Sequence, residues 1–251
     1  MTSPRLSTVI EDYAEVLAIA AGDGLPLVIV GGQAVNIWAE RYLDVEPQLT
    51  DFRPFTSKDL DVLGAERDLE EIARVTGAKK LKSLRKIFVP TVGVLEISRG
   101  GVVLKVEILK RIYGATTQDV LAGAVVLKRG ALTLRLIDPF TLLETKIENA
   151  ANLPQETRQD VKHVRMMIFC LRGLLREAVG QVAAGAMSGR QCVVALERTL
   201  QIIGSPSAKK LGAQHGIKWL AALPLQELAA SKDAKLKNFS EKRLPRLFNR
   251  E

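Results

Sequence analysis

The character of the chain changes at Asp138, and this change limits the folds that the sequence can form. Before Asp138, short apolar runs rich in β-branched residues alternate with segments of helical spacing, a pattern typical of an α/β sheet domain. Asp138-Pro139 reads as an N-cap followed by proline in the first helical turn. Helical patterns then follow over 139–152, 156–179, 189–203 and 217–230. We therefore expect an α/β (α+β) domain in 1–137, with a mixed sheet flanked by helices, and a basic helical domain in 138–251.

Composition favours a folded protein without a membrane span. Hydrophobic residues make up 47% of the 251 residues and charged residues 25%, as in globular proteins. No apolar run approaches the roughly 18 residues that span a bilayer, and the first residues do not have the pattern of a signal peptide. Two cysteines and two histidines are too few for a disulfide framework or a zinc site of the usual spacing. We expect a cytoplasmic protein with no membrane partner.

Charge is unevenly distributed along the chain. The net charge is +8, but residues 1–125 hold 15 basic and 17 acidic side chains, whereas residues 126–251 hold 21 and 11. A basic second half indicates a polyanion as a possible partner. Lysines and arginines that only solvate helix surfaces would give the same count, and charge alone does not separate the two interpretations.

A glycine pair follows the first expected strand. Gly31-Gly32 separates the β-branched run 27–30 from the helical spacing of 34–42. Glycines at this place let the backbone approach a ligand closely, and free N–H groups at a helix start suit phosphate. Taken alone, such a pair more often marks an ordinary tight turn.

Two aspartates lie on the second expected strand. Asp59 and Asp61 alternate with Leu60 and Val62, and side chains at i and i+2 share one face of a strand. Adjacent carboxylates repel unless a cation lies between them, and such hard oxygen ligands suit Mg²⁺ or Mn²⁺. An Asp-x-Asp pattern alone is also common on solvated surfaces.

A third acid lies in the apolar run 103–109. Glu107 would be costly there without a partner. Convergence with the two aspartates would explain it, and so would a pair with Lys105 on the same face. Glu96 in the run 92–97 is the alternative third carboxylate. We prefer Glu107 because its flanks are more completely apolar.

Gly100-Gly101 between the two runs is a hairpin signal, and a further hairpin is expected around 128–130.

The combination of these features resembles a known family. A strand, Gly-Gly and helix, then Asp-x-Asp on a strand, then an acid on a third strand resemble the nucleotidyltransferase superfamily, with the DNA-polymerase-beta-like fold. Gly31-Gly32-Gln33-Ala34 and the segment 57–61 look most like the branch that contains AbiEii-type toxins of toxin–antitoxin systems. The segments 142–146 and 158–160 also resemble that branch. The matches cover about residues 27–165.

The resemblance implies roles for individual residues. It implies that Asp59, Asp61 and Glu107 are catalytic and bind two divalent ions, Mg²⁺ or Mn²⁺, while an NMP moves from an NTP to an acceptor. A nucleotide-binding role follows in the same way for Gly31, Gly32, Gln33, Ser57 and Lys146. Without the resemblance, Lys146 reads as a lysine that snorkels beside a buried helix face. Asp160 and Lys162 then read as surface charges, and His163 as a surface or interface residue.

The sequence departs from the family in two ways. Between Gly32 and Asp59 lie 26 residues, a much longer spacing than is usual there, so we expect the loop 44–56 to be an insertion. A glutamate also stands where the third carboxylate is usually an aspartate, and its extra methylene would relax metal geometry.

The acceptor is a separate question. The basic second half and the basic run 79–86 are consistent with an RNA such as tRNA, and the resemblance also implies a possible antitoxin. Two alternatives stay open. One is a nucleotidyltransferase that acts on a protein or a small molecule, and the other is a binding module without turnover.

Overall fold

The computed structural model describes residues 7–22, 24, 27–81, 90–99 and 101–248. Within them, strands form one seven-stranded mixed sheet in the order β3-β4-β5-β2-β1-β7-β6. β2 pairs with β5 and β1 with β7 in parallel, and the other neighbours are antiparallel. The strands are β1 Val28–Ile29, β2 Leu60–Leu63, β3 Lys79–Leu81, β4 Thr91–Arg99, β5 Val102–Leu109, β6 Val125–Arg129 and β7 Leu132–Leu136. The expected α/β class with a mixed sheet flanked by helices is confirmed.

Both expected hairpins are present. β4 and β5 pair along their length on either side of residues 100–101, and β6 pairs with β7 around Gly130, which has a φ of +57°. The basic run 79–86 is described only in part. Residues 79–81 form the edge strand β3, whereas 82–86 lie outside the described residues.

In the described residues before Asp138, the α-helices that accompany the strands are α1 Ala14–Gly22, α2 Gly31–Tyr42, α3 Glu66–Thr76 and α4 Thr117–Gly123. A 3-10 turn, η1 Ile10–Tyr13, precedes α1. α2 begins at the glycine pair, three residues before the expected start, because Val30 already has the extended backbone of an N-cap residue. The glycines therefore form the first turn of α2 rather than a turn in front of it.

After Asp138 the described chain is helical, as expected. The Asp138 carboxylate accepts hydrogen bonds from the N–H groups of Phe140 and Thr141, which confirms it as the N-cap of α5. The α-helices are α5 Pro139–Asn152, α6 Asp160–Ala183, α7 Gly189–Ile203, α8 Pro206–His215, α9 Leu225–Ala230, α10 Ala234–Asn238 and α11 Pro245–Phe248. The turn η3 Trp219–Ala222 precedes α9, and the π-helical turn η4 Phe239–Arg243 precedes α11.

The expected helix over 217–230 is wrong. Instead, Ser205 caps a separate helix, α8, which has Pro206 in its first turn and ends at Gly216 in the left-handed conformation. Ser205-Pro206 is a signal for the start of a helix and Gly216 is a signal for its end, and together they place the helix earlier in the chain than predicted. A short 3-10 turn and α9 occupy most of the predicted range.

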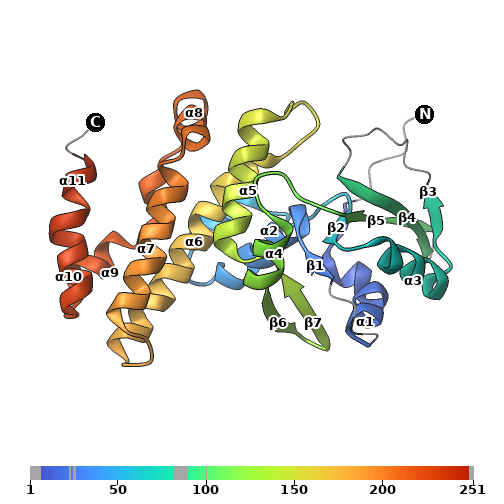
Figure 1. Cartoon of the computed structure of the whole chain (residues 1–251), viewed down its shortest axis with the longest axis horizontal. Coiled ribbons are helices and arrows are strands. Elements are labelled where there is room, and N and C mark those ends of the chain that lie inside the picture. The colour runs from blue at the N-terminus through green and yellow to red at the C-terminus, as the bar shows by residue number, and fades with distance from the viewer. Residues whose placement is uncertain (1–6, 23, 25–26, 82–89, 100, 249–251) are drawn as a thin grey trace.

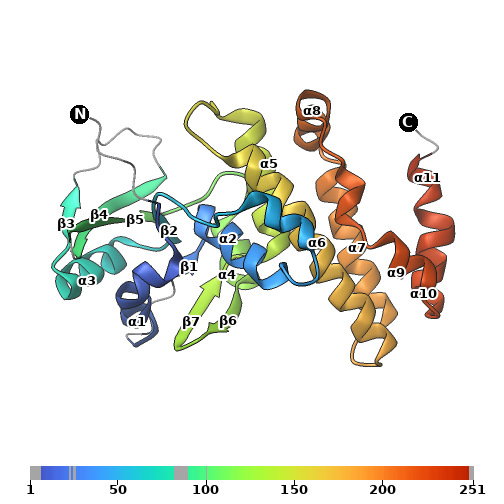
Figure 2. The ribbon, with the colours of Figure 1, turned by 180° about the vertical axis from the view of Figure 1, so that it is seen from behind.

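The segment 44–56 folds back onto α6. It contains the 3-10 helix η2 Pro47–Phe52, and just before it the fully buried Glu46 carboxylate pairs with Arg172 and Arg176 of α6. The Nη1 of Arg176 lies 2.8 Å from the Glu46 Oε1. The view from behind shows α2 and this segment lying beside α6 (Figure 2). The segment is therefore a packed part of the structure and not a free loop.

The sheet and the C-terminal helices lie at opposite ends of the molecule, with α5 and α6 between them (Figure 1). Buried apolar side chains nevertheless form one cluster that continues from the sheet into the helices after residue 138. The division into domains at 137/138 stays a prediction. Among the described helices, none combines the length and the apolar character needed to cross a membrane.

Candidate functional site

Three carboxylates converge at the centre of the sheet. Asp59 immediately precedes β2, Asp61 lies on β2, and Glu107 lies directly beside Asp61 on the parallel neighbour β5. One ligand oxygen from each of the three lies within 4.8 Å of the others. The alternation on β2 sends Leu60 and Val62 into the core, so the two aspartates must share the opposite face. The structure thus brings together the three acids that the sequence singled out.

Gly31 lies against this cluster. Its φ of +65° lies in the left-handed region, and a Cβ at this position would lie 2.6 Å from the Asp61 Cγ and 2.7 Å from the Asp61 Cβ. Any side chain at position 31 would therefore displace the Asp61 carboxylate. The N–H of Val30 donates to the Asp61 carbonyl at 2.9 Å, which fixes the start of α2 against β2.

The two candidates for the third carboxylate have different surroundings. Glu107 accepts a hydrogen bond from the Thr91 hydroxyl on β4, and it lies within the cluster. Glu96 lies opposite Lys105 on β5, with 3.9 Å between the Lys105 Nζ and the Glu96 Oε1. Lys105, the alternative partner of Glu107, thus pairs with Glu96 instead, and the geometry favours Glu107 as the third carboxylate.

Electrostatics of the cluster favour a bound cation. Burial, and then repulsion from Asp59 and Glu107, raises the pKa of Asp61 to about 7. Burial also raises the pKa of Asp59, although the charges of Lys58 and Lys146 oppose this. Close carboxylates that are reluctant to ionise together are stabilised by a divalent cation with a preference for oxygen ligands. The donor set therefore fits Mg²⁺ or Mn²⁺.

The carboxylates open into a cavity of about 400 Å³. Its walls come from the start of α2, the segment before β2, the chain after β5, and the facing parts of α5 and α6. Ser57 lines it next to Gly32, because a Cβ at Gly32 would lie 2.7 Å from the Ser57 Oγ. Of the residues assigned to a nucleotide by resemblance, four line this cavity: Gly31, Gly32, Ser57 and Lys146.

A buried ion pair forms the wall that α5 and α6 contribute. The Lys146 Nζ lies 3.0 Å from the Asp160 Oδ1, and the Arg158 Nε lies 2.5 Å from the Asp160 Oδ2. Lys146 and Asp160 are only 6% and 2% exposed. Burial alone would raise the pKa of Asp160, but Lys146 and Arg158 outweigh burial and lower it. Asp160 is therefore a buried partner of Lys146, and its interpretation as a surface charge is wrong.

His163 is a cavity residue to which sequence reasoning gave no role in the site. Its ring lies next to Gly32, since a Cβ there would lie 3.4 Å from the His163 Cε1, and its buried Nδ1 has no hydrogen-bond partner within the described part of the chain. Burial, and then the charge of Lys146, lowers the pKa of His163 to about 3, so the imidazole is neutral at physiological pH. The spacing of Asp160 and His163 on one helix face was the available signal.

Gln33 does not reach the cavity with its side chain. Its Nε2 donates to the Thr8 carbonyl at 3.1 Å and approaches the Thr8 Oγ1 at 3.3 Å. Thr8 in turn exchanges backbone hydrogen bonds with Ser57, and its hydroxyl lies 3.0 Å from that of Tyr13. The side chain of Gln33 thus holds the segment before β2, a contact that the local sequence pattern did not indicate.

Comparison with known proteins found similarity to solved structures but not to any family model or curated protein. A solved structure of an antigenic nucleotidyltransferase-like protein from Paracoccidioides brasiliensis is similar, at 12% identity and a TM-score of 0.46. The similarity covers 77% of this chain and 95% of that one. A TM-score at this level is too low to support a conclusion about this chain, so the functional argument rests on the geometry of the site.

Proposed function

We propose that this protein is a metal-dependent nucleotidyltransferase, which moves a nucleoside monophosphate from an NTP to an acceptor hydroxyl. In this reaction the acceptor oxygen forms a bond to the α-phosphorus, the bond to the β-phosphate oxygen breaks, and pyrophosphate leaves. The observation that carries the proposal is the convergence of Asp59, Asp61 and Glu107 within 4.8 Å, directly against Gly31 at the start of α2. Carboxylates beside a helix start place a cation site next to a phosphate site.

The carboxylates have two tasks in this proposal. Asp59 just before β2 and Asp61 on β2 would hold the cation, which supplies charge stabilisation on the transferring phosphoryl group when bound. Glu107, oriented by the Thr91 hydroxyl, would accept the proton of the acceptor hydroxyl. Asp61 must release its own proton before it can act as a ligand, since its pKa without metal is about 7.

The opposite walls of the cavity would bind the triphosphate. The first N–H groups of α2, at Gly31 and Gly32, have no acceptor within the helix and point their partial positive charge outward. Ser57 adds a hydroxyl beside Gly32. Lys146 is held in place by Asp160, and its positive charge would offset the negative charge of the phosphates.

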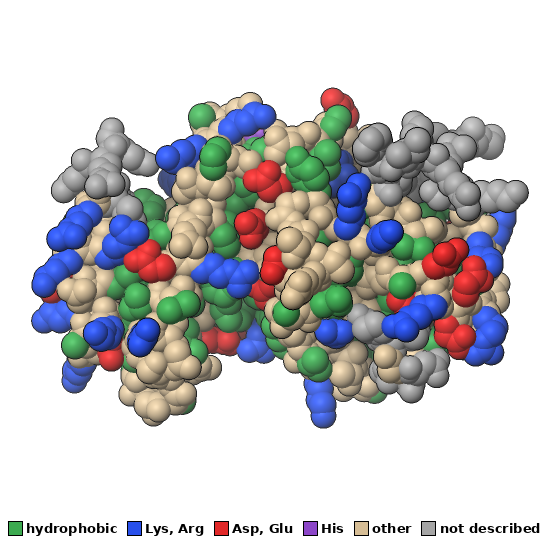
Figure 3. Space-filling view, viewed as in Figure 1, with side chains coloured by type: hydrophobic (Ala, Val, Ile, Leu, Met, Phe, Trp, Pro, Cys, Tyr) green, Lys and Arg blue, Asp and Glu red, His purple; other side chains and the backbone are tan. Residues whose placement is uncertain are grey.

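An RNA such as tRNA is the acceptor that we propose. In its support, exposed lysine and arginine side chains gather over α10 and α11, at the left of Figure 3. Lys235, Lys237 and Arg246 belong to this surface. A role as a cytoplasmic toxin with an antitoxin partner is supported only by the resemblance of the glycine and Asp-x-Asp segments to AbiEii-type toxins.

The reaction is tested with labelled NTPs, Mg²⁺ or Mn²⁺ and total RNA. We compare the wild type with Asp61→Ala, and with Glu96→Gln as a matched control on the neighbouring strand outside the cluster. We expect Asp61→Ala to lose labelling about a hundredfold or more, and Glu96→Gln to label like the wild type. Equal labelling by the wild type and Asp61→Ala would overturn the assignment.

The acceptor is tested separately. Labelling of RNA that weakens steeply between about 50 and 200 mM salt would support an electrostatic RNA contact. Labelling of a protein or a small molecule, with none of RNA, would replace the acceptor and keep the reaction. Growth arrest that follows expression of the wild type and not of Asp61→Ala would support the toxin role.

A further inference from the structure

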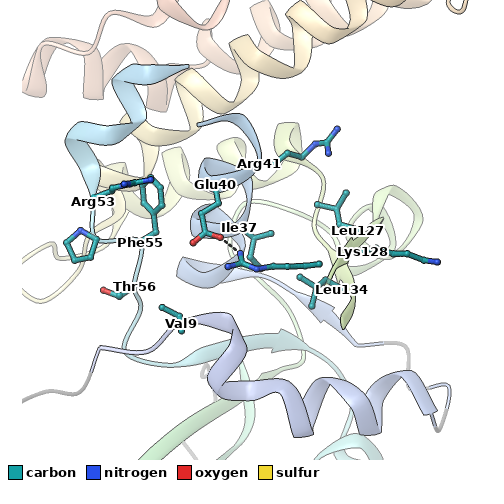
Figure 4. A pocket seen from close by; sticks show the side chains of 12 residues that line it. Val9, Ile37, Glu40, Arg41, Arg53, Phe55, Thr56, Leu127, Lys128 and Leu134 are labelled. Atoms are coloured by element: carbon teal, nitrogen blue, oxygen red, sulfur yellow. Dashed lines mark hydrogen bonds and ion pairs between the residues drawn. The ribbon is translucent and has the colours of Figure 1, made fainter. Parts of the chain in front are cut away.

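A second and larger cavity lies on the other side of the segment that precedes β2. It has a volume of about 720 Å³ and is bounded by α2, residues 53–56, β6 and β7 (Figure 4). Thr56 lines both this cavity and the carboxylate cavity. None of the site residues discussed above lines it.

The floor of this cavity is apolar. Ile37 of α2, Leu134 of β7 and Phe55 are buried and line it, and Leu127 of β6 lies beside them (Figure 4). A space of this size and lining fits one or two large apolar side chains or a small ligand. Three of the four side chains are aliphatic, which matches hydrocarbon better than it matches stacked bases.

The rim carries positive charge. Arg53 and Lys128 are exposed, and no carboxylate pairs with either of them in the part of the chain that the structure describes. The Arg53 guanidinium lies 5.9 Å from the centre of the Phe55 ring. Glu40 also lines the cavity (Figure 4), and its carboxylate pairs with Arg129, which pairs with Glu11 of η1 as well. These two acids and one arginine leave a single negative charge, which the two positive charges of Arg53 and Lys128 outweigh, so the net charge at the rim is positive.

One wall of the cavity is the edge of the sheet. β6 is the last strand in the sheet order, so one side of its backbone pairs with β7 and the other has no strand partner among the described residues. Val126 on β6 is 61% exposed and shares its face of the strand with Lys128, whereas Leu127 between them points to the other face. An exposed edge strand offers backbone hydrogen bonds to an added extended segment.

We propose that this cavity is a docking site for an acidic peptide segment of a partner protein. The segment extends along β6, inserts a large apolar side chain between Phe55 and Leu127, and places its carboxylates near Arg53 and Lys128. The apolar floor, the positive rim and the open strand edge together favour a peptide over a nucleic acid, because nucleic-acid interfaces are predominantly polar and a base-stacking site needs more aromatic side chains. The inference does not depend on the proposed function.

The test is a selection from a displayed library of random peptides of about twelve residues, with the full chain as bait. Affinities of the selected peptides are then measured by fluorescence anisotropy. The test variant is Arg53→Glu/Lys128→Glu, and the control is Lys209→Glu/Lys232→Glu, which makes the same change of charge at exposed positions elsewhere. Arg53 and Lys128 are exposed, as the two control lysines are, so both double variants should fold.

We expect selected peptides with net negative charge and at least one large apolar residue. Their affinity should fall about tenfold or more in the rim variant and less than about twofold in the control. Methylation of alternate backbone N–H groups in the peptide should also weaken binding, because strand addition uses those groups.

Four results would overturn the proposal. They are a selection that yields no binder, enrichment of basic or uncharged peptides, equal loss of affinity in both double variants, and no effect of backbone methylation. Displacement of the peptides by a short single-stranded oligonucleotide that itself depends on Arg53 would assign the cavity to nucleic acid instead.

Discussion

Gly31→Ala is the change for which the structure makes its sharpest prediction. Two separate energetic costs add up at this position. A non-glycine residue in the left-handed conformation costs about 1–2 kcal/mol, and a Cβ that lies 2.6 Å from the Asp61 Cγ must push that side chain aside. Forcing atoms into an occupied site costs about 1–3 kcal/mol. We therefore expect the free energy of unfolding to fall by about 2–5 kcal/mol, and the affinity for Mn²⁺ to fall with it.

Gly77→Ala is the matched control. Gly77 ends α3 with the same φ of +65°, but a Cβ there would meet nothing within 4 Å. Gly77→Ala has only the cost of the left-handed backbone conformation, so its free energy of unfolding should fall by about 1–2 kcal/mol. Its affinity for Mn²⁺ should equal that of the wild type. Chemical denaturation measures the first quantity, and isothermal titration calorimetry measures the second.

A double-mutant cycle isolates the contact. Asp61→Gly removes the three atoms that would lie nearest to a Cβ at position 31, so the two changes together should cost less than the sum of each alone by about 1 kcal/mol or more. Equal stability of Gly31→Ala and Gly77→Ala, or costs that simply add in the cycle, would refute the argument that Gly31 is required by the position of Asp61.

Three further predictions concern buried charges. Burial and the neighbouring acids raise the pKa of Asp61 to about 7. In the metal-free protein, the stability that protonated Asp61 contributes is therefore greatest below the pKa of an unfolded aspartate, near 4. This contribution is lost as the pH rises through about 7. Asp61→Asn should flatten this pH dependence in denaturation experiments and abolish the increase in Mn²⁺ affinity between pH 5 and pH 7 that we expect of the wild type. Lys146→Ala leaves Asp160 without its buried partner and should cost about 3–5 kcal/mol, whereas Arg158→Ala removes a partner whose side chain is 40% exposed and should cost about 1 kcal/mol. Glu46→Gln leaves two arginines of α6 without their common acid and should cost about 3 kcal/mol or more, so a thermal midpoint unchanged from the wild type would contradict the anchoring of the segment 44–56.

The sequence predicts the acidic cluster well because strand alternation is a local property. It puts Asp59 and Asp61 on one face without any knowledge of the fold, and the apolar flanks of Glu107 indicate that this acid must have a partner. It does not reveal that β2 and β5 are parallel neighbours, since that pairing joins segments about 45 residues apart and depends on the whole sheet. The convergence of the three acids therefore needed the structure.

The helical half shows a second limit of sequence reasoning. Asp160 and His163 read as surface residues because no pattern on α6 alone says which neighbouring helix covers their face. Only the packing of α5 against α6 brings Lys146 to Asp160 and turns both into a buried pair. The start of α8 is the opposite case, since its capping signal, Ser205-Pro206, is local, and the prediction of a helix over 217–230 did not use it.

The position of β2 within the sheet has a consequence for how this chain tolerates changes in length. β2 is hydrogen-bonded on both sides, to β1 and to β5, and a shift of one residue would exchange Asp61 with Val62 and turn the acids into the core. An insertion or deletion between residues 57 and 63 should therefore abolish folding. We expect a change in length between Gly32 and Ser57 to be tolerated better, because no strand register depends on those residues.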